Sequence, residues 1–189
     1  MRAAWYQRNG EAGEVLVVGE LPTPVPGPGE VRVKIHASGV NPSDVKGRRG
    51  RPLGAYGLIV PHSDGAGVVD AVGAGVARHR TGDRVWIWNG QWKRQYGTAA
   101  DYIVLPQEQA QPLPATVGFE GGACMGIPVL TALHAVALLG EISSKTILVT
   151  GGGSGVGYYV TQVASRVGGA SVIATAGSDA RRNLATAAG

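Results

Sequence analysis

Hydrophobic and polar positions follow different patterns in the two parts of the chain. In the first part, residues 31–37 (VRVKIHA) alternate apolar and polar side chains, the period of a strand with one buried face. Similar short segments between glycine turns predict six or seven strands in all, at residues 3–6, 15–19, 65–73, 82–88 and 98–105 besides this one. A proline-rich connector (residues 21–30) and a Gly/Arg/Pro-rich loop (residues 47–61) separate some of them. Residues 1–120 therefore predict a barrel-like β domain.

The pattern changes after about residue 118. Residues 119–126 and 129–139 are rich in alanine and leucine and predict helices. An apolar strand (146–150), a glycine run (151–157), a helix (158–167) and a second apolar strand (171–176) follow, which together make one βαβ unit. Continuously apolar strands are typical of a parallel sheet covered on both faces. Residues 121–189 therefore predict the first βαβ part of a Rossmann dinucleotide-binding domain, and the chain as a whole is α/β.

The glycine run has a physical use between a strand and a helix. Without Cβ atoms the backbone can approach a pyrophosphate, and the helix N-terminus offers unpaired N–H groups and a positive dipole end. The spacing departs from G-x-G-x-x-G, because a serine stands at the middle position. The residues predicted to bind the cofactor here are Gly152, Ser154, Gly155, Val156 and Gly157. A turn with a purely structural role is the alternative.

The end of the second apolar strand indicates which dinucleotide is bound. An NAD site places Asp or Glu there to hold the ribose hydroxyls, but this strand runs into Gly177 and Ser178. A small strand tip leaves room for a 2′-phosphate, to which Ser178 can donate and with which Arg181 or Arg182 can pair. The sequence therefore favours NADPH, the alternative being that both arginines are solvated helix surface.

Composition and charge narrow the class of protein. The single cysteine excludes a disulfide framework and an all-cysteine metal site. The net charge is +4, but no dense Lys/Arg run or basic helix is present, which argues against a nucleic-acid partner. No apolar run approaches the roughly 18–20 residues of a membrane span, and the N-terminus lacks the apolar core of a signal peptide. We expect a cytoplasmic protein without membrane contact.

The order of these elements, with several short motifs, resembles the medium-chain dehydrogenase/reductase superfamily. The resemblance covers essentially the whole chain, and its motifs are specific in combination although each is modest alone. They are GVNPSD (39–44), PHSDGAGVV (61–69), GDRVW (82–86), TAADY (98–102) and GIPVLTA (126–132). The resemblance implies a GroES-like β-barrel domain followed by a Rossmann domain. Members are longer than this chain, so the chain is expected to be C-terminally truncated, and the full-length protein is expected to be a homodimer.

Within this superfamily the residues resemble the zinc-free, zeta-crystallin-like quinone oxidoreductase branch. The zinc branch has cysteine where this chain has Asn41, and a His-Glu pair where it has Ser63-Asp64. The four cysteines of a structural zinc lobe are missing, and none of the four histidines is paired at ligand spacing. We therefore expect no metal site.

The resemblance implies hydride transfer from NADPH to a quinone. Asn41 would lie by the nicotinamide ribose or the substrate oxygen, Thr131 near the nicotinamide amide, and Asp44 would orient the Asn41 loop. The alternatives are a turn residue before proline for Asn41, a polar contact inside a helix for Thr131 and a helix cap for Asp44. Lys46 replaces a tyrosine common in the family, so a substrate contact at that position is in question.

Two other functions stay open at this point. One is NADPH-dependent reduction of activated C=C bonds in 2-alkenals or enoyl thioesters, and the other is a non-catalytic nucleotide- or RNA-binding fragment. An aromatic run at Trp86, Trp88, Trp92 and Tyr96 suits a planar quinone, although Trp86 and Trp88 alternate on one strand face, which favours packing in the core or a lid. The basic residues 48–51 either flank a substrate cleft or form a solvated loop.

Overall fold

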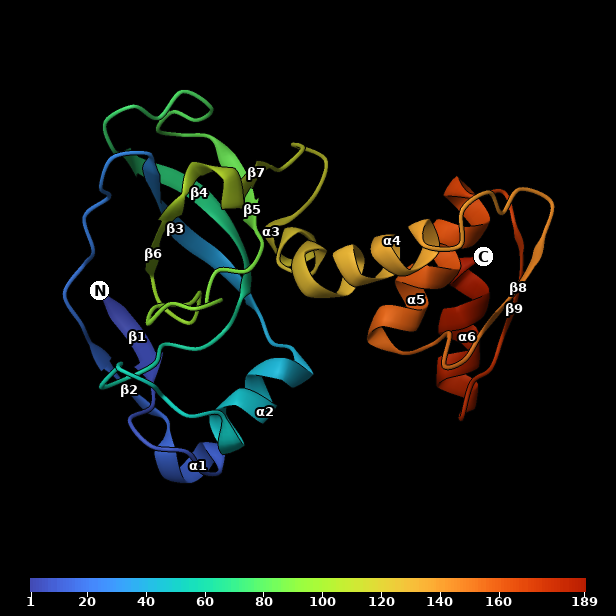
Figure 1. Ribbon diagram of the computed structural model, residues 1–189, viewed down its shortest axis with the longest axis horizontal. Helices are drawn as coiled ribbons and strands as arrows, with labels where there is room; N and C mark the ends of the chain where they lie inside the picture. Colours follow the sequence, from blue (N-terminus) through green and yellow to red (C-terminus); the bar gives the residue numbers. More distant parts are fainter. The chain divides into compact units, whose positions relative to one another are not determined.

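In the computed structural model, which describes residues 1–189, the chain forms two units, Met1–Ile127 and Pro128–Gly189 (Figure 1). The elements of the first unit are β1 (Arg2–Trp5), α1 (Ala12–Val15), β2 (Val17–Glu20), β3 (Glu30–Gly39), α2 (Pro42–Gly50), β4 (Asp64–Val72), β5 (Arg84–Ile87), β6 (Tyr102–Pro106), β7 (Ala110–Pro112) and α3 (Phe119–Gly122). The second unit contains α4 (Leu130–Ala137), β8 (Thr146–Val149), α5 (Gly155–Gln162), β9 (Ser171–Ala174) and α6 (Asp179–Ala188). The predicted α/β class is confirmed, whereas the domain boundary at residue 120 falls inside α3 and stays a prediction.

The first unit is built on an antiparallel five-stranded sheet in the order β6-β3-β4-β5-β7, with β1 and β2 paired separately. An isolated bridge between Ala3 and Ala100 ties the smaller sheet to the rest. The alternating side chains of the long strands point into one core, as the sequence pattern predicts. This core consists of Val31, Val33, Val69, Val85, Ile87, Ile103, Leu105 and Ala110.

Two details of the first unit differ from the sequence prediction. Residues 47–50 belong to α2 and not to a loop, because the Asn9 side-chain amide donates to the carbonyls of Gly47, Arg48 and Arg51 at 2.9–3.2 Å. This contact, from a residue far away in sequence, satisfies carbonyls that the helix end leaves open. The predicted strand at 98–105 begins only at Tyr102, since the residues before it bond to three different segments. The amides of Thr98 and Asp101, for example, donate to the carbonyls of His62 and Arg2.

In the second unit, β8 and β9 pair in parallel and the helices lie on one side of them (Figure 1). Val136, Ile142, Ala164 and Ala170 form the core on that side. On the strands themselves, the side chains of Leu148 and Ile173 are 64% and 59% exposed. One face of this two-stranded sheet is therefore packed by helices and the other is exposed, although strands this apolar are typical of a sheet covered on both faces. None of the helices has the length and apolarity needed to cross a bilayer.

Candidate functional site

The glycine run lies at the end of β8 and is tied to the end of β9. Gly151 has a left-handed φ of 72°, and its N–H donates to the Thr175 hydroxyl at 2.9 Å. The next amide, of Gly152, donates to the Thr175 carbonyl at 3.0 Å. These two bonds fix the start of the glycine loop relative to the end of β9, the strand whose last residues favour NADPH over NADH.

The glycines of the loop serve two purposes. A Cβ at Gly152 would stand 2.6 Å from the Ala174 Cβ, and one at Gly153 or Gly157 would overlap the carbonyl of Arg181 or Gly151, respectively. These three glycines are therefore required by close packing. In contrast, no atom lies within 4 Å of the position that a Cβ would take at Gly155. At this exposed glycine, the loop leaves room for another molecule to approach the backbone.

Ser154 begins α5 as its N-cap. Its hydroxyl accepts a hydrogen bond from the Gly157 N–H at 3.3 Å, which satisfies one open donor of the first turn. The N–H groups of Gly155 and Val156 precede the first possible intrahelical bond and lie on exposed residues. Together with the positive end of the helix dipole, these two donors suit an anionic group.

The start of α6 lies against the glycine loop through the contact between Gly153 and the Arg181 backbone. Ser178 caps this helix by accepting from the Arg181 N–H at 3.4 Å, and the space around Gly177 is open. Arg182 pairs with Asp179 at 3.0 Å, whereas Arg181 is exposed and forms no ion pair. The structure therefore brings the two predicted parts of the cofactor site together and leaves the Arg181 guanidinium available for a ligand.

In the first unit, the structure brings Asn41 and Asp44 together with a third residue, Asp64. The Asn41 backbone N–H donates to the Asp44 carboxylate at 2.7 Å, and the Asn41 side-chain amide donates to the Asp64 carboxylate at 2.8 Å. The same Asp64 oxygen accepts from the Ile127 N–H at 2.8 Å. Asn41 is thus held at both its backbone and its side chain, which is more than a turn residue before proline requires.

Asp64 is 1% exposed, and its second carboxylate oxygen is buried without a hydrogen-bond partner. Burial raises the pKa of this carboxyl to about 6, although the bonds from Ile127 and Asn41 oppose the shift. Burial also raises the pKa of Asp44, against the opposing hydrogen bond from Asn41 and the charges of His62 and Arg51. The cluster therefore concentrates two desolvated carboxyl groups around one amide.

Because the pKa of Asp64 is higher in the folded than in the unfolded chain, ionisation of this group opposes folding. The resulting loss of folding free energy is smallest below about pH 4, grows as the pH rises to about 6, and is then constant at about 3 kcal/mol. We predict that Asp64→Asn, which keeps an acceptor for Asn41 and Ile127, becomes more stable relative to the parent across this interval. Urea unfolding at pH 4 and pH 6.5 measures the difference. Asp179→Asn, at an exposed carboxyl, serves as the control, and an equal stability difference at both pH values for Asp64→Asn would contradict the assignment.

A relay of hydrogen bonds runs from His62 into the same cluster. The Thr98 hydroxyl donates to the Asp64 carbonyl at 2.6 Å, so its oxygen must accept from Ser38 at 2.9 Å. Ser38 has then used its own proton and must accept from the Nδ1–H of His62, also at 2.9 Å. This order leaves Nε2 as the free ring nitrogen of a neutral His62. The residue adopts a left-handed φ of 77°, unusual for histidine, and burial lowers its pKa.

Sequence reasoning treated Asp64 only as a departure from a zinc ligand, and set His62 aside as a metal candidate. The signal for Asp64 was present, because an acid inside a strand of small apolar residues has to find a partner. Thr131 lies exposed on α4 of the second unit, and its role stays a prediction. No group of three His, Cys, Asp or Glu side chains in the structure is arranged to hold a metal ion.

Known proteins resemble the chain in both sequence and structure. Residues 27–115 match the family model "Alcohol dehydrogenase GroES-like domain". The quinone oxidoreductase of Rattus norvegicus is 34% identical over 97% of this chain and 55% of its own length. The Escherichia coli quinone oxidoreductase, solved in complex with NADPH, superposes with a TM-score of 0.85 at 27% identity, over all of this chain and 56% of that one.

Residues 27–115 thus match an alcohol dehydrogenase GroES-like domain, and the whole chain is similar in sequence and structure to quinone oxidoreductases of the medium-chain dehydrogenase/reductase type. The GroES-like assignment and the similarity to the quinone oxidoreductase branch are thereby confirmed. A structure described as an NAD-dependent alcohol dehydrogenase is also similar, with a TM-score of 0.87 at 37% identity over all of this chain and 62% of that one. The chain spans about half the length of the curated relatives it matches.

Proposed function

We propose that the chain carries the substrate domain and the first nucleotide-binding elements of an oxidoreductase that transfers hydride from NADPH to a quinone without zinc. The observation that carries this proposal is the open backbone at Gly155 in a loop that contacts the start of α6 at Gly153, with the exposed and unpaired Arg181 on that helix. The similarity to quinone oxidoreductases, one of them an NADPH complex, supports the same cofactor and reaction. A cytoplasmic location and a homodimer stay predictions from the sequence.

The residues present fit NADPH on structural grounds. The N–H groups of Gly155 and Val156 at the start of α5 would hold the pyrophosphate, at the place where no Cβ blocks the approach. Ser178 and Arg181 at the start of α6 would hold the 2′-phosphate, next to the open space at Gly177. No carboxylate stands at the strand tip to repel that phosphate, and the carboxylate of Asp179 is paired with Arg182.

NADPH supplies the hydride when it is bound. The contribution of the first unit is a positioned amide, since Asp44 and Asp64 fix the Asn41 backbone and side chain. A positioned polar group of this kind orients an acceptor and lowers the entropic part of the barrier. The proposed site residues are therefore Asn41 and Asp44 in the first unit, with Thr131 proposed at the nicotinamide amide.

A panel of acceptors tests the reaction. NADPH oxidation at 340 nm is followed with a series of quinones and, in parallel, with 2-alkenals and enoyl thioesters. We expect turnover with quinones, which accept hydride without a Lewis acid. Turnover with the enones alone would replace the quinone reductase by a C=C reductase. Absence of both NADPH binding and turnover, together with salt-sensitive RNA binding, would favour the non-catalytic alternative.

A further inference from the structure

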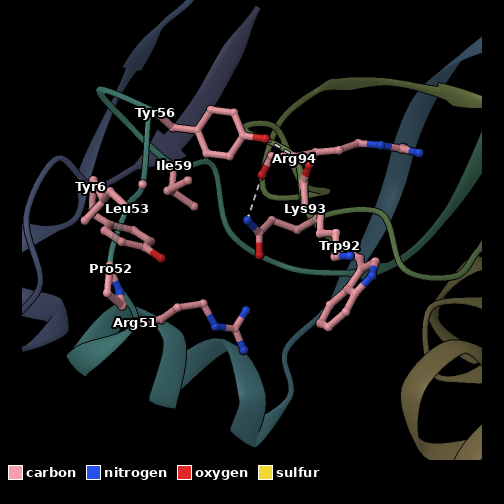
Figure 2. A pocket seen from close by; sticks show the side chains of 11 residues that line it. Tyr6, Arg51, Pro52, Leu53, Tyr56, Ile59, Trp92, Lys93 and Arg94 are labelled. Carbon is pink, nitrogen blue, oxygen red and sulfur yellow. Dashed lines mark hydrogen bonds between the residues drawn. The ribbon is translucent and has the colours of Figure 1, made fainter.

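The first unit contains a pocket of about 370 Å³ (Figure 2), which is within the roughly 300–1,000 Å³ typical of small-molecule sites. Two loops and one strand end enclose it. Its lining consists of Tyr6, residues 51–54 (RPLG), Tyr56, Ile59 and residues 91–94 (QWKR). All of these residues belong to the first unit, so the pocket is complete within that unit.

Hydrogen bonds inside the lining hold the pocket in shape. The Tyr56 hydroxyl donates to the Lys93 carbonyl at 2.9 Å, which joins the two loops directly. The Gln91 side chain donates to the Arg94 carbonyl at 2.8 Å, and Lys93 adopts a left-handed φ of 55°. Both bonds are drawn in Figure 2. The pocket is therefore a built feature of the loops and not a gap between unconnected segments.

The lining carries three cations and no carboxylate. Some arginines elsewhere in this unit form ion pairs, as Arg32 does with Asp70 and Arg49 with Glu11. Arg51 and Lys93 in the pocket form none, although both are exposed. The nearest carboxylate, of Asp44, affects Arg51 through its charge, but no ion pair or hydrogen bond joins the two side chains. The excess of positive charge in the lining favours an anionic ligand.

The Tyr6 hydroxyl, a hydrogen-bond donor, points into the same space. Tyr6 is only 6% exposed and packs against Val15 and Ile59, but its hydroxyl has no hydrogen-bond partner. Figure 2 shows this hydroxyl and the Arg51 guanidinium directed into the pocket, with the Trp92 ring on the opposite side. A tyrosine hydroxyl that opens into the pocket and has no partner in the protein is free to donate to a bound ligand. Flat rings at Trp92 and Tyr56 offer stacking surfaces at the rim.

We propose that this pocket binds a planar aromatic ligand that carries an anionic group, such as a carboxylate or sulfonate. The anionic group pairs with Arg51 and accepts from the Tyr6 hydroxyl, and the ring system stacks on Trp92. The identification of this ligand as the hydride acceptor rests on the proposed function. It narrows the acceptor to quinones with an acidic substituent. Binding to the pocket itself needs neither NADPH nor turnover.

Isothermal calorimetry without NADPH tests the proposal with two probes of similar shape, anthraquinone-2-sulfonate and neutral 2-(hydroxymethyl)anthraquinone. The sulfonate is expected to bind at least about tenfold more tightly, since it adds a charge-assisted hydrogen bond to Arg51. Arg51→Gln should remove most of that preference and Tyr6→Phe should reduce it several-fold, with the neutral probe unaffected by Arg51→Gln. Arg80→Gln, at a side chain 91% exposed outside the pocket, is the matched control.

Equal affinity for the two probes, or a preference that survives both Arg51→Gln and Tyr6→Phe, would overturn the proposal. Circular dichroism melting of each variant confirms that the fold is retained. The outcome is separate from that of the proposed function. If the chain prefers the sulfonate but reduces no quinone with NADPH, the proposed reaction is wrong and the proposed ligand site stands. If the chain reduces neutral quinones but shows no preference between the two probes, the proposed reaction stands and the proposed ligand site is wrong.

Discussion

Gly157→Ala is expected to destabilise the second unit by about 3 kcal/mol, whereas Gly155→Ala should leave its stability unchanged or raise it by up to about 1 kcal/mol. The two glycines are two residues apart in the same helix turn, yet their surroundings are opposite. A methyl group at Gly157 would overlap the Gly151 carbonyl oxygen and crowd the Ser154 hydroxyl, and the backbone cannot move away without breaking the Ser154 cap. A methyl group at Gly155 meets no atom.

Urea unfolding followed by far-UV circular dichroism measures both variants, and NADPH titration then separates packing from binding. Gly155→Ala should fold like the parent but lose at least about tenfold in NADPH affinity, because its methyl group fills the space proposed for the pyrophosphate. Parent-like stability of Gly157→Ala would contradict the packing argument. Parent-like NADPH binding of Gly155→Ala would show that the pyrophosphate lies elsewhere.

Arg181→Gln is expected to weaken NADPH binding by roughly 10- to 100-fold and to leave NADH binding unchanged, because only NADPH carries the 2′-phosphate. The magnitude follows from the roughly 1.5–3 kcal/mol of a hydrogen bond between charged groups. Arg182→Gln should have a smaller effect, since Arg182 already pairs with Asp179. Lys145→Gln removes an exposed charge just before β8 and is the matched control.

Fluorescence titration of the three variants with both cofactors provides the data, at one fixed salt concentration because exposed charges are screened. An equal loss of NADPH and NADH affinity in Arg181→Gln would mean that the side chain supports the fold of the loop and does not read the phosphate. A loss in Lys145→Gln of the same size would assign the effect to general charge.

Elements with a strong local pattern could be predicted from the sequence. The alternation at residues 31–37 became β3, and the βαβ unit lies where the apolar strands and the glycine run indicated. What the sequence could not show depends on contacts between distant residues. The Asn9 side chain extends α2 through residues that look like a loop, and β7 is three residues long and exists only through its pairing with β5.

The candidate site shows the same division. The glycine loop was predictable because its chemistry is local to one turn, although only the structure separates Gly155 from the glycines needed for packing. Asp64 and His62 were not predicted as functional residues, because their significance comes from partners on β3 and in the loop before β6. The sequence indicated a planar ligand for the run that contains Trp92 and a possible cleft beside residues 48–51, but the pocket that joins Arg51 and Trp92 to Tyr6 appears only in the fold.

We expect this chain to bind NADPH in preference to NADH, through the loop after β8 and the start of α6. Parallel calorimetric titration of the unmodified chain with NADPH and NADH measures this preference. NADPH should bind at least about tenfold more tightly, as one additional phosphate–arginine contact implies. A ratio of dissociation constants near one, or tighter binding of NADH, would contradict it.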